Sequence, residues 1–182
     1  MAGLRQLALS YRKEEDERVR RATDTQRAAA LNRIEGEIES DKIQNFLGTY
    51  EIPSSSLIRK TNESLKNAIV KRFEPDLKAK INKLVVSLYL VKDMSPNDPY
   101  VIIESTESET SVIVIINLAH PHWSQLTNDE SITNFIRHCT YDGVSEWKAY
   151  FATGKIEPDT VKLIKDNLLR IPLIMKDVRS SK

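Results

Sequence analysis

The stretch SVIVIIN, residues 111–117, decides the fold of this chain. Its central residues are all β-branched and apolar, a composition typical of a strand. Because successive side chains of a strand point to opposite faces, an unbroken apolar run predicts a strand that is buried on both faces. Helices should therefore cover the sheet on at least one side.

Two further strands are predicted upstream of this run. Residues 85–91 are largely β-branched and apolar, and residues 100–104 form a second, shorter candidate. The polar residues 105–110 then make a turn into the strand 111–117. Short polar connections favour an antiparallel meander, so the expected sheet is mostly antiparallel, with three strands or slightly more.

Helices are predicted both before and after these strands along the sequence. A serine run after Pro53 can cap a helix over 55–72, and Pro75 ends that helix or begins a short further turn towards Leu84. The helical spacing of residues 55–73 places these side chains inward: Leu57, Ile58, Leu65, Ala68, Ile69 and Phe73.

The last third of the chain is predicted to be helical again. Asn128 can cap a first helix, Gly143 begins a second segment, and Pro158 begins a third that continues until Pro172. The fold class is therefore α+β, with the C-terminal helices packed on the sheet. Three parts follow: a helical arm (1–52), an α+β domain (53–178) and a frayed tail (179–182).

The arm is a long helix over about 4–38, or two shorter ones, with helical spacing continuing through Ile43, Phe46, Leu47 and Tyr50. Its apolar stripe is thin and interrupted by charges, so it supplies coiled-coil heptads poorly. Self-association through the arm and packing of a lone helix on its own domain both stay open. The stripe consists of Leu4, Leu7, Ala8, Tyr11, Val19, Ala22, Ala29, Ala30 and Ile34.

Charge and cysteine usage restrict the classes of partner. The 27 Lys and Arg residues against 26 Asp and Glu residues give a net charge of +1, so no global field draws the chain to nucleic acid or membrane. Cys139 is the single cysteine, which excludes an internal disulfide. No apolar stretch is long enough to span a bilayer, and the first residues lack a secretory pattern. We predict a cytoplasmic protein without a membrane partner.

The glycines argue against nucleotide binding by this chain. A phosphate loop needs several glycines close together so that backbone amides can approach the ligand. The five glycines here are all isolated, and no Walker loop, dinucleotide fingerprint or kinase glycine loop is present. The sequence predicts no cofactor.

The residues that follow the strand 111–117 form one distinctive cluster: Asn117, His120, Pro121, His122 and Trp123. Two histidines two apart could share a metal, but no spacing marks a third ligand, and we predict no metal site. The favoured interpretation is structural, with Asn117 and His120 tying the strand exit and Pro121 fixing the turn. Cys139 beside His138 is interpreted as a buried core residue rather than a nucleophile.

The segment 59–83 carries an excess of basic residues that could meet a nucleic-acid backbone. A solvated helix face is the alternative interpretation. The nearby carboxylates Glu104, Glu107 and Glu109 are interpreted as a solvated loop. The candidate nucleic-acid contacts are Lys60, Lys66, Lys71, Arg72, Lys78, Lys80 and Lys83.

The pattern of residues 83–126 resembles a known family. The segment contains a strand, a Pro-containing loop, a second strand that begins at Tyr100, and an apolar strand that ends in Asn117 and is followed by His120-Pro121. This order is similar to the region after the nucleotide-binding domain of bacterial GHKL-type (gyrase, histidine-kinase and MutL-like) ATPases. His122 stands where the family usually has an aromatic residue. The resemblance implies a C-terminal module of a larger ATPase, or a separate protein related to one, with the ATP chemistry carried elsewhere.

Three functions follow as hypotheses. The first is a non-catalytic interaction or coupling module of an ATPase-related assembly, in anti-phage defence or DNA maintenance as the resemblance implies, with a protein partner or self-association. The second is a nucleic-acid-binding protein that uses the basic segment 59–83. The third is a small hydrolase or metal enzyme around His120 and His122.

Overall fold

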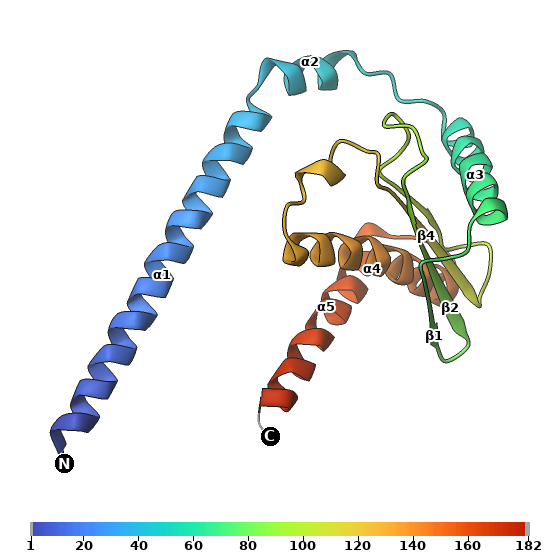
Figure 1. Ribbon diagram of the computed structural model, residues 1–182. Helices are drawn as coiled ribbons and strands as arrows, with labels where there is room; N and C mark the ends of the chain where they lie inside the picture. Colours follow the sequence, from blue (N-terminus) through green and yellow to red (C-terminus); the bar gives the residue numbers. More distant parts are fainter. Residues whose placement is uncertain (1, 181–182) are drawn as a thin grey trace. The chain divides into compact units, whose positions relative to one another are not determined.

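The computed structural model describes the backbone of residues 2–180 and the side chains of residues 17, 18, 20, 21 and 23–171. The chain divides into two compact units, residues 1–54 and 55–182, and each is described by itself. The first unit holds α1 (Ala2–Ile38) and α2 (Asp41–Thr49). The second holds a sheet with helices, which confirms the predicted α+β class (Figure 1).

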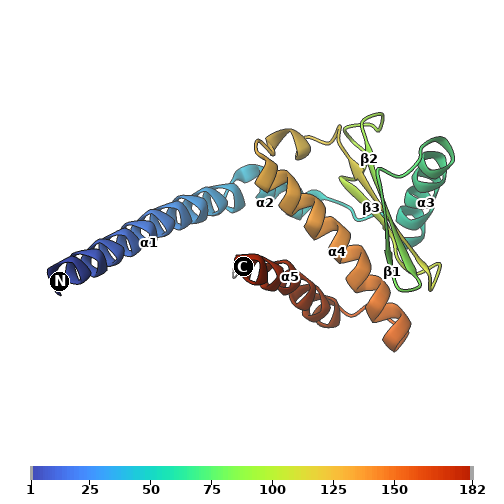
Figure 2. The ribbon, with the colours of Figure 1, turned by 60° about the horizontal axis from the view of Figure 1, so that its bottom comes forward.

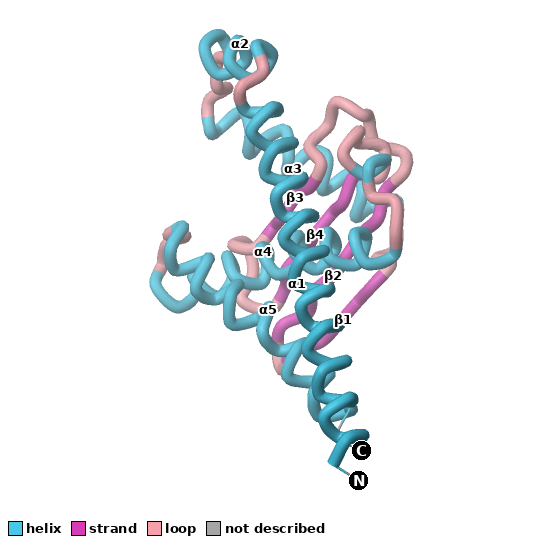
Figure 3. Tube along the Cα trace, turned by 90° about the vertical axis from the view of Figure 1, so that its left-hand side faces the viewer, coloured by secondary structure: helices cyan, strands magenta, loops and turns pink. Residues whose placement is uncertain are grey.

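The sheet has four strands in the order β1-β2-β4-β3. These are β1 (Leu77–Ile81), β2 (Leu84–Val91), β3 (Val101–Glu104) and β4 (Ser111–Asn117), and the last coincides with the run that predicted it. Figure 3 shows β1 and β3 at opposite edges of the sheet. The two edge strands differ in sequence, because β1 (LKAKI) alternates apolar residues with lysines and β3 (VIIE) has three consecutive apolar residues.

Two expectations about the sheet were wrong. Residues 77–81 form a strand rather than a helical turn, and Asn82, at φ 55°, helps to make the tight connection to β2. The pairing of β2 with β4 is parallel, so the strands do not form a meander, although the other two pairings are antiparallel and confirm a mostly antiparallel sheet. The physical reason is that the chain first passes to the far edge, forms β3 there, and only then returns to place β4 in the centre.

The helices α3 (Ser55–Arg72) and α4 (Asp129–Thr153) lie on opposite faces of the sheet (Figure 2). Ile69 of α3 packs with Ile115, whereas α4 covers Val112 and Val114. Ile115 and Val114 are both 0% exposed, which confirms that β4 is buried on both faces.

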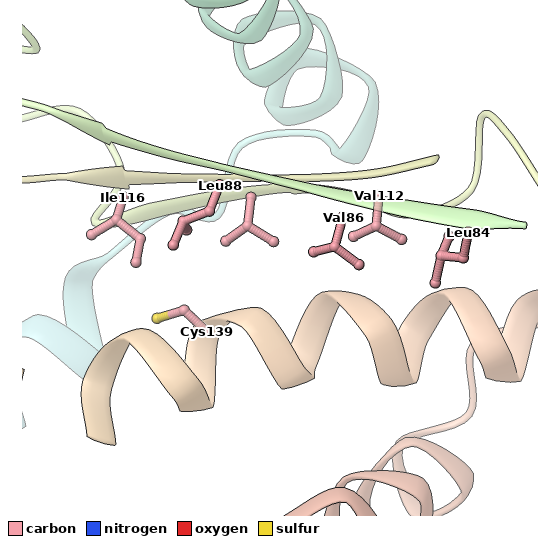
Figure 4. Packing of buried hydrophobic residues seen from close by; sticks show 7 residues of the cluster. Leu84, Val86, Leu88, Val112, Ile116 and Cys139 are labelled. Carbon is pink, nitrogen blue, oxygen red and sulfur yellow. The ribbon is translucent and has the colours of Figure 1, made fainter. Parts of the chain in front are cut away.

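Helix α4 runs without a break through Gly143, so the prediction that a new segment begins there was wrong. A Cβ atom added to Gly143 would lie 3.1 Å from side-chain carbons of both Val112 and Val114. The glycine therefore allows close approach of helix and sheet. Cys139 of α4 points into the same core (Figure 4). The predicted cap at Asn128 is confirmed, since its side chain accepts a hydrogen bond from the Ser131 N–H at 2.8 Å.

Part of the inward face predicted for α3 was wrong. Ile69 is buried and Leu65 and Phe73 are half-buried, as expected, but Leu57, Ile58 and Ala68 are exposed. Ile69, Leu65 and Phe73 pack with Ile115 of the sheet, whereas Leu57, Ile58 and Ala68 belong to neither core cluster of the described residues.

The last helix is α5 (Pro158–Ser180), which packs on α4 and is joined to it by an ion pair of 2.6 Å between Lys165 and Asp142. It continues beyond Pro172, where the sequence predicted its end. Residues 179 and 180 belong to this helix, whereas 181 and 182 of the predicted tail lie outside the described residues.

The first unit has two helices and no core of its own among the described side chains. Ser40 caps α2 by accepting from the Ile43 N–H at 3.4 Å. Every described side chain of residues 17–54 is exposed, except for Ser40, which is half-buried. For the predicted stripe, the side chains of Leu4, Leu7, Ala8, Tyr11, Val19 and Ala22 lie outside the described residues.

Membrane insertion gains no support from the helices. Within the described part of the chain, no helix combines the length and apolar character that a bilayer crossing requires.

Candidate functional site

The cluster after β4 is built around the buried side chain of Asn117. Its Nδ2 donates to the carbonyl oxygens of Ser95 at 2.8 Å and Asp98 at 3.4 Å, and its Oδ1 accepts from the Ala119 N–H at 2.9 Å. These bonds hold the loop between β2 and β3 against the exit of β4. The side chain satisfies backbone groups, which is the geometry expected of a structural residue.

The two histidines of this cluster face aromatic rings. His120 Nδ1 accepts from the His122 N–H at 3.2 Å, and its ring lies 6.1 Å from that of Tyr100. The His122 ring lies 5.1 Å from Phe135 of α4, which also contacts Trp123. Across the described ranges, no three His, Cys, Asp or Glu side chains gather as metal ligands. The histidines and Trp123 pack the strand exit onto α4.

Cys139 has the environment of a core residue. It is buried, and this burial, with the nearby Asp142 carboxylate, raises the pKa of its thiol to about 11. The thiolate, which is the nucleophilic form, is therefore rare near neutral pH. This placement does not support nucleophilic chemistry at Cys139.

The basic segment 59–83 does not act as one surface. Lys66 is buried and ion-paired, so its assignment as a nucleic-acid contact was wrong. Arg72 pairs with Asp93 at 3.2 Å. Lys78 and Lys80 lie on β1, on the same side of that strand because they are two residues apart. Nucleic-acid binding by the exposed cations stays a prediction; they are Lys60, Lys71, Arg72, Lys78, Lys80 and Lys83.

The structure brings together Lys66 of the basic segment, Glu104 and Glu107, and a further carboxylate, Glu146, that no sequence prediction had named. They line a cleft of about 710 Å³ beside β3, a size within the range of ligand sites. One wall is a stripe of α3, the floor is β3 with its following turn, and the other wall is the end of α4 with the loop after it. The lining residues central to the argument are Ile58, Lys66, Ile103, Glu104, Glu146 and Ile156.

Lys66 joins α3 to the floor of the cleft. Its Nζ lies 2.9 Å from Glu107 Oε2 and 3.8 Å from Glu104 Oε2. Glu104 also accepts the backbone N–H groups of Thr106 and Glu107, at 3.1 and 3.0 Å. The hydrogen bond and charge of Lys66 lower the pKa of Glu107. The interpretation as a solvated loop was therefore wrong for Glu104, which ends β3 and is partly buried, whereas Glu107 is exposed in the following turn and pairs with the buried Lys66.

Glu146 stands on the opposite wall in a different electrostatic environment. Its Oε2 accepts a hydrogen bond from the hydroxyl of the buried Ser105 at 3.1 Å. Burial raises the pKa of this carboxyl, the Ser105 hydrogen bond opposes that rise, and Asp142 adds to it. Over the described side chains, Glu146 takes part in no ion pair. The cleft thus presents a carboxylate without a counter-ion.

One signal in the sequence could have found half of this cleft. Ser55, Ile58, Asn62 and Lys66 follow one another at helical spacing, so they share one face of α3, and Ile69 lies on the same face. Glu146 carries no such signal. Its neighbours in space come from segments far away in the sequence.

The second notable surface lies on the arm. Its large apolar residues are spaced along the end of α1, along α2 and into the segment after it, and all are exposed. The Phe46 and Tyr50 rings stack with centroids 4.5 Å apart. We call this set the arm surface: Leu31, Ile34, Ile38, Ile43, Phe46, Leu47, Tyr50 and Ile52.

Comparison with known proteins adds no relative to this description. No protein-family model matches the sequence, and neither curated proteins nor solved structures give a significant match.

Proposed function

We propose that this chain is a non-catalytic interaction module that associates through its helical arm. The observation that carries the proposal is the arm surface, whose side chains are between 37% (Ile43) and 80% (Ile52) exposed. Contiguous exposed apolar surface marks sites of protein interaction in soluble proteins. The unit that carries it has no buried side chain among those described, so its apolar residues do not serve a core of that unit.

The spacing on α2 supports recognition by a helical face. Ile43, Phe46, Leu47 and Tyr50 stand at positions i, i+3, i+4 and i+7, the anchor spacing of a helix that lies against a groove or a second helix. Burying one such side chain contributes about 1.5–3 kcal/mol. A helix as short as α2 is marginal by itself, so association would also stabilise its helical state.

A second copy of the chain is the partner proposed for the arm. Charged residues on α1 are already paired along their own helix, with Arg21 3.7 Å from Glu17 and Arg27 3.6 Å from Asp24. Pairs of this kind reduce the repulsion that two identical helices would otherwise experience. An apolar surface flanked by internally balanced charge can therefore associate with itself.

The wider role proposed is coupling within an ATPase-related assembly, in defence or in DNA maintenance. Its support is the resemblance of residues 83–126 to the region that follows the nucleotide-binding domain in GHKL-type ATPases. The isolated glycines agree with energy conversion in another polypeptide or region, because they offer no loop to wrap a triphosphate.

Sedimentation velocity over a range of protein concentrations tests the arm directly. The full chain should exceed its monomer mass of 20.8 kDa, and the double variant Phe46→Asp/Leu47→Asp should return to it. Leu163→Asp, which changes an exposed leucine on α5, is the matched control and should sediment like the parent. A full chain that stays monomeric at every concentration contradicts self-association.

A further inference from the structure

The two edges of the sheet differ in how they are protected. The edge strand β1 carries Lys78 and Lys80, both exposed, and lysine on an edge discourages pairing with another strand. The edge strand β3 begins with Val101, Ile102 and Ile103 and has no basic residue. Only β1 therefore carries this protection.

The hydrogen-bond pattern identifies which backbone groups of β3 face outward. The Tyr100 carbonyl accepts from the Asn117 N–H at 3.0 Å, and the register pairs Val101 with Ile116. Residues of an antiparallel pair alternate between bonding to the partner strand and pointing away from it. Tyr100, Ile102 and Glu104 therefore bond to β4, while the N–H and C=O groups of Val101 and Ile103 point out of the sheet.

The cleft lies along this open edge. Ile102, Ile103 and Glu104 all line it, although successive side chains of a strand point to opposite faces. Consecutive residues can border one cavity only where that cavity meets the edge of the strand. The cleft is thus a slot beside β3, with α3 forming one wall and the end of α4 the other.

One carboxylate inside the slot favours a basic group on the guest. Four carboxylates, those of Glu63, Glu104, Glu107 and Glu146, line the slot together with three basic side chains, Arg59, Lys66 and Lys155, of which only Lys66 is buried. Glu104 and Glu107 already contact Lys66, whereas Glu146 accepts a hydrogen bond from the Ser105 hydroxyl and has no ion pair with any described side chain. An ammonium or guanidinium group next to Glu146 would supply the missing counter-charge.

The rim of the slot is apolar. Ile58 on α3 and Ile156 after α4 line it and are 43% and 45% exposed, so each offers surface to a neighbouring side chain. A guest that places apolar and basic side chains alternately would satisfy both the rim and Glu146. That alternation is the natural pattern of an extended strand.

We propose that this slot binds an extended segment of a partner protein with alternating apolar and basic residues, which adds to the sheet as a strand beside β3. The backbone of the guest would bond to the outward N–H and C=O groups of Ile103, and a lysine or arginine would face Glu146. This mode of recognition uses main-chain bonds for affinity and side-chain contacts for selectivity. The proposal does not depend on the arm.

A defined peptide tests the proposal on the full chain. The probe is fluorescein-labelled Val-Lys-Val-Lys-Val-Lys-Val with an amidated C-terminus, and binding is followed by fluorescence anisotropy. It should bind, and the Glu146→Gln variant should bind it about tenfold more weakly, because one charge-assisted hydrogen bond is lost. Glu130→Gln, which changes an exposed carboxylate outside the cleft, is the matched control and should leave binding unchanged.

Two peptide controls separate strand addition from attraction by charge. A probe methylated on alternate backbone nitrogens, along the edge that would pair, keeps its lysines but should lose binding. A probe with glutamate in place of lysine should also fail to bind. In hydrogen exchange, the Ile103 amide should become protected when the unmodified probe is added.

The outcomes that overturn the proposal are equally definite. They are absence of binding at millimolar probe, equal binding of the methylated probe, equal binding by Glu146→Gln, and protection that appears at β1 instead of Ile103. Because the arm is intact throughout, loss of self-association in the sedimentation experiment would leave this result standing.

Discussion

Apolar side chains are exposed on the arm, whereas similar side chains are buried in the α+β unit. In the α+β unit, Ile115 is 0% exposed between the sheet and α3, whereas Ile52 in the first unit is 80% exposed. Helical or strand spacing of apolar residues predicts which side chains share a face, but does not say whether that face is covered by the same chain. The difference separates residues that stabilise the fold from residues available for association.

The largest expected effect comes from making the same substitution in both regions. Ile115→Ala should lower the free energy of unfolding by about 4 kcal/mol, because it removes buried methyl groups and leaves a cavity. Ile38→Ala should change it by less than about 0.5 kcal/mol, since the side chain is exposed. Urea unfolding followed by circular dichroism at low protein concentration measures both. Similar losses from the two variants would mean that the arm has a core of its own.

A pair of glycines sharpens the comparison. Gly143→Leu should destabilise the protein by about 2–3 kcal/mol, because the new side chain would press on Val112 and Val114. Gly36→Leu on α1 meets no atom within 4 Å and should be neutral or stabilise the helix. Thermal unfolding compares the two. A stable Gly143→Leu protein would show that α4 does not approach the sheet this closely.

A pair of lysines on α3 tests the buried ion pair. Removing one partner of a fully buried ion pair lowers the free energy of unfolding by about 3–5 kcal/mol. Because Glu107 is half-exposed and water can solvate it, the loss expected for Lys66→Met is about 2 kcal/mol. The exposed Lys60→Met should have an effect within about 0.5 kcal/mol. Urea unfolding of both variants measures the difference. Equal effects would place Lys66 in solvent and restore it as a candidate nucleic-acid contact.

The smallest effect concerns pH and Glu146. Burial raises the pKa of this carboxyl in the folded state, so between its ordinary pKa of 4.5 and the raised value the folded chain binds more protons than the unfolded chain. Its contribution to stability is therefore fully present below 4.5 and is lost as pH rises through the folded pKa. Glu146→Gln should raise the melting temperature near pH 7.

The control for this prediction is Glu107→Gln, whose parent carboxyl has a lowered pKa. A depressed pKa gives the opposite sign, so that variant should be less stable near neutral pH. Its difference from the parent should fade as pH falls below the ordinary value of 4.5. If Glu146→Gln and Glu107→Gln shift stability in the same direction near pH 7, the assigned environments are wrong.

The sequence predicted much of the fold because its main elements carry local signals. The apolar run 111–117 predicted a doubly buried strand, and Asn128 predicted the start of α4. Strand β1 was not predicted because apolar residues alternate with two lysines in its five residues, and only residues 73–76 separate it from α3. Gly143 was misread because the demand for a small residue comes from Val112 and Val114, which lie some thirty residues earlier in the chain.

The cleft could not be predicted in the same way. Lys66 meets Glu107, and Ser105 meets Glu146, each across a separation of 41 residues. Helical and strand periodicity relate only residues that are near in sequence. These pairs form because the folded sheet brings α3, β3 and α4 together, so no spacing rule could predict them. The arm surface, by contrast, was visible as helical spacing in Ile43, Phe46 and Tyr50, although its exposure was not.

The central claim is that the α+β unit holds the core and the arm holds the association surface. Sedimentation velocity of the full chain beside a fragment of residues 55–182, each checked for folding by circular dichroism, tests it most directly. The account predicts a folded, monomeric fragment and a full chain whose mass increases with concentration. An unfolded fragment, or a fragment that associates as strongly as the full chain, would contradict it.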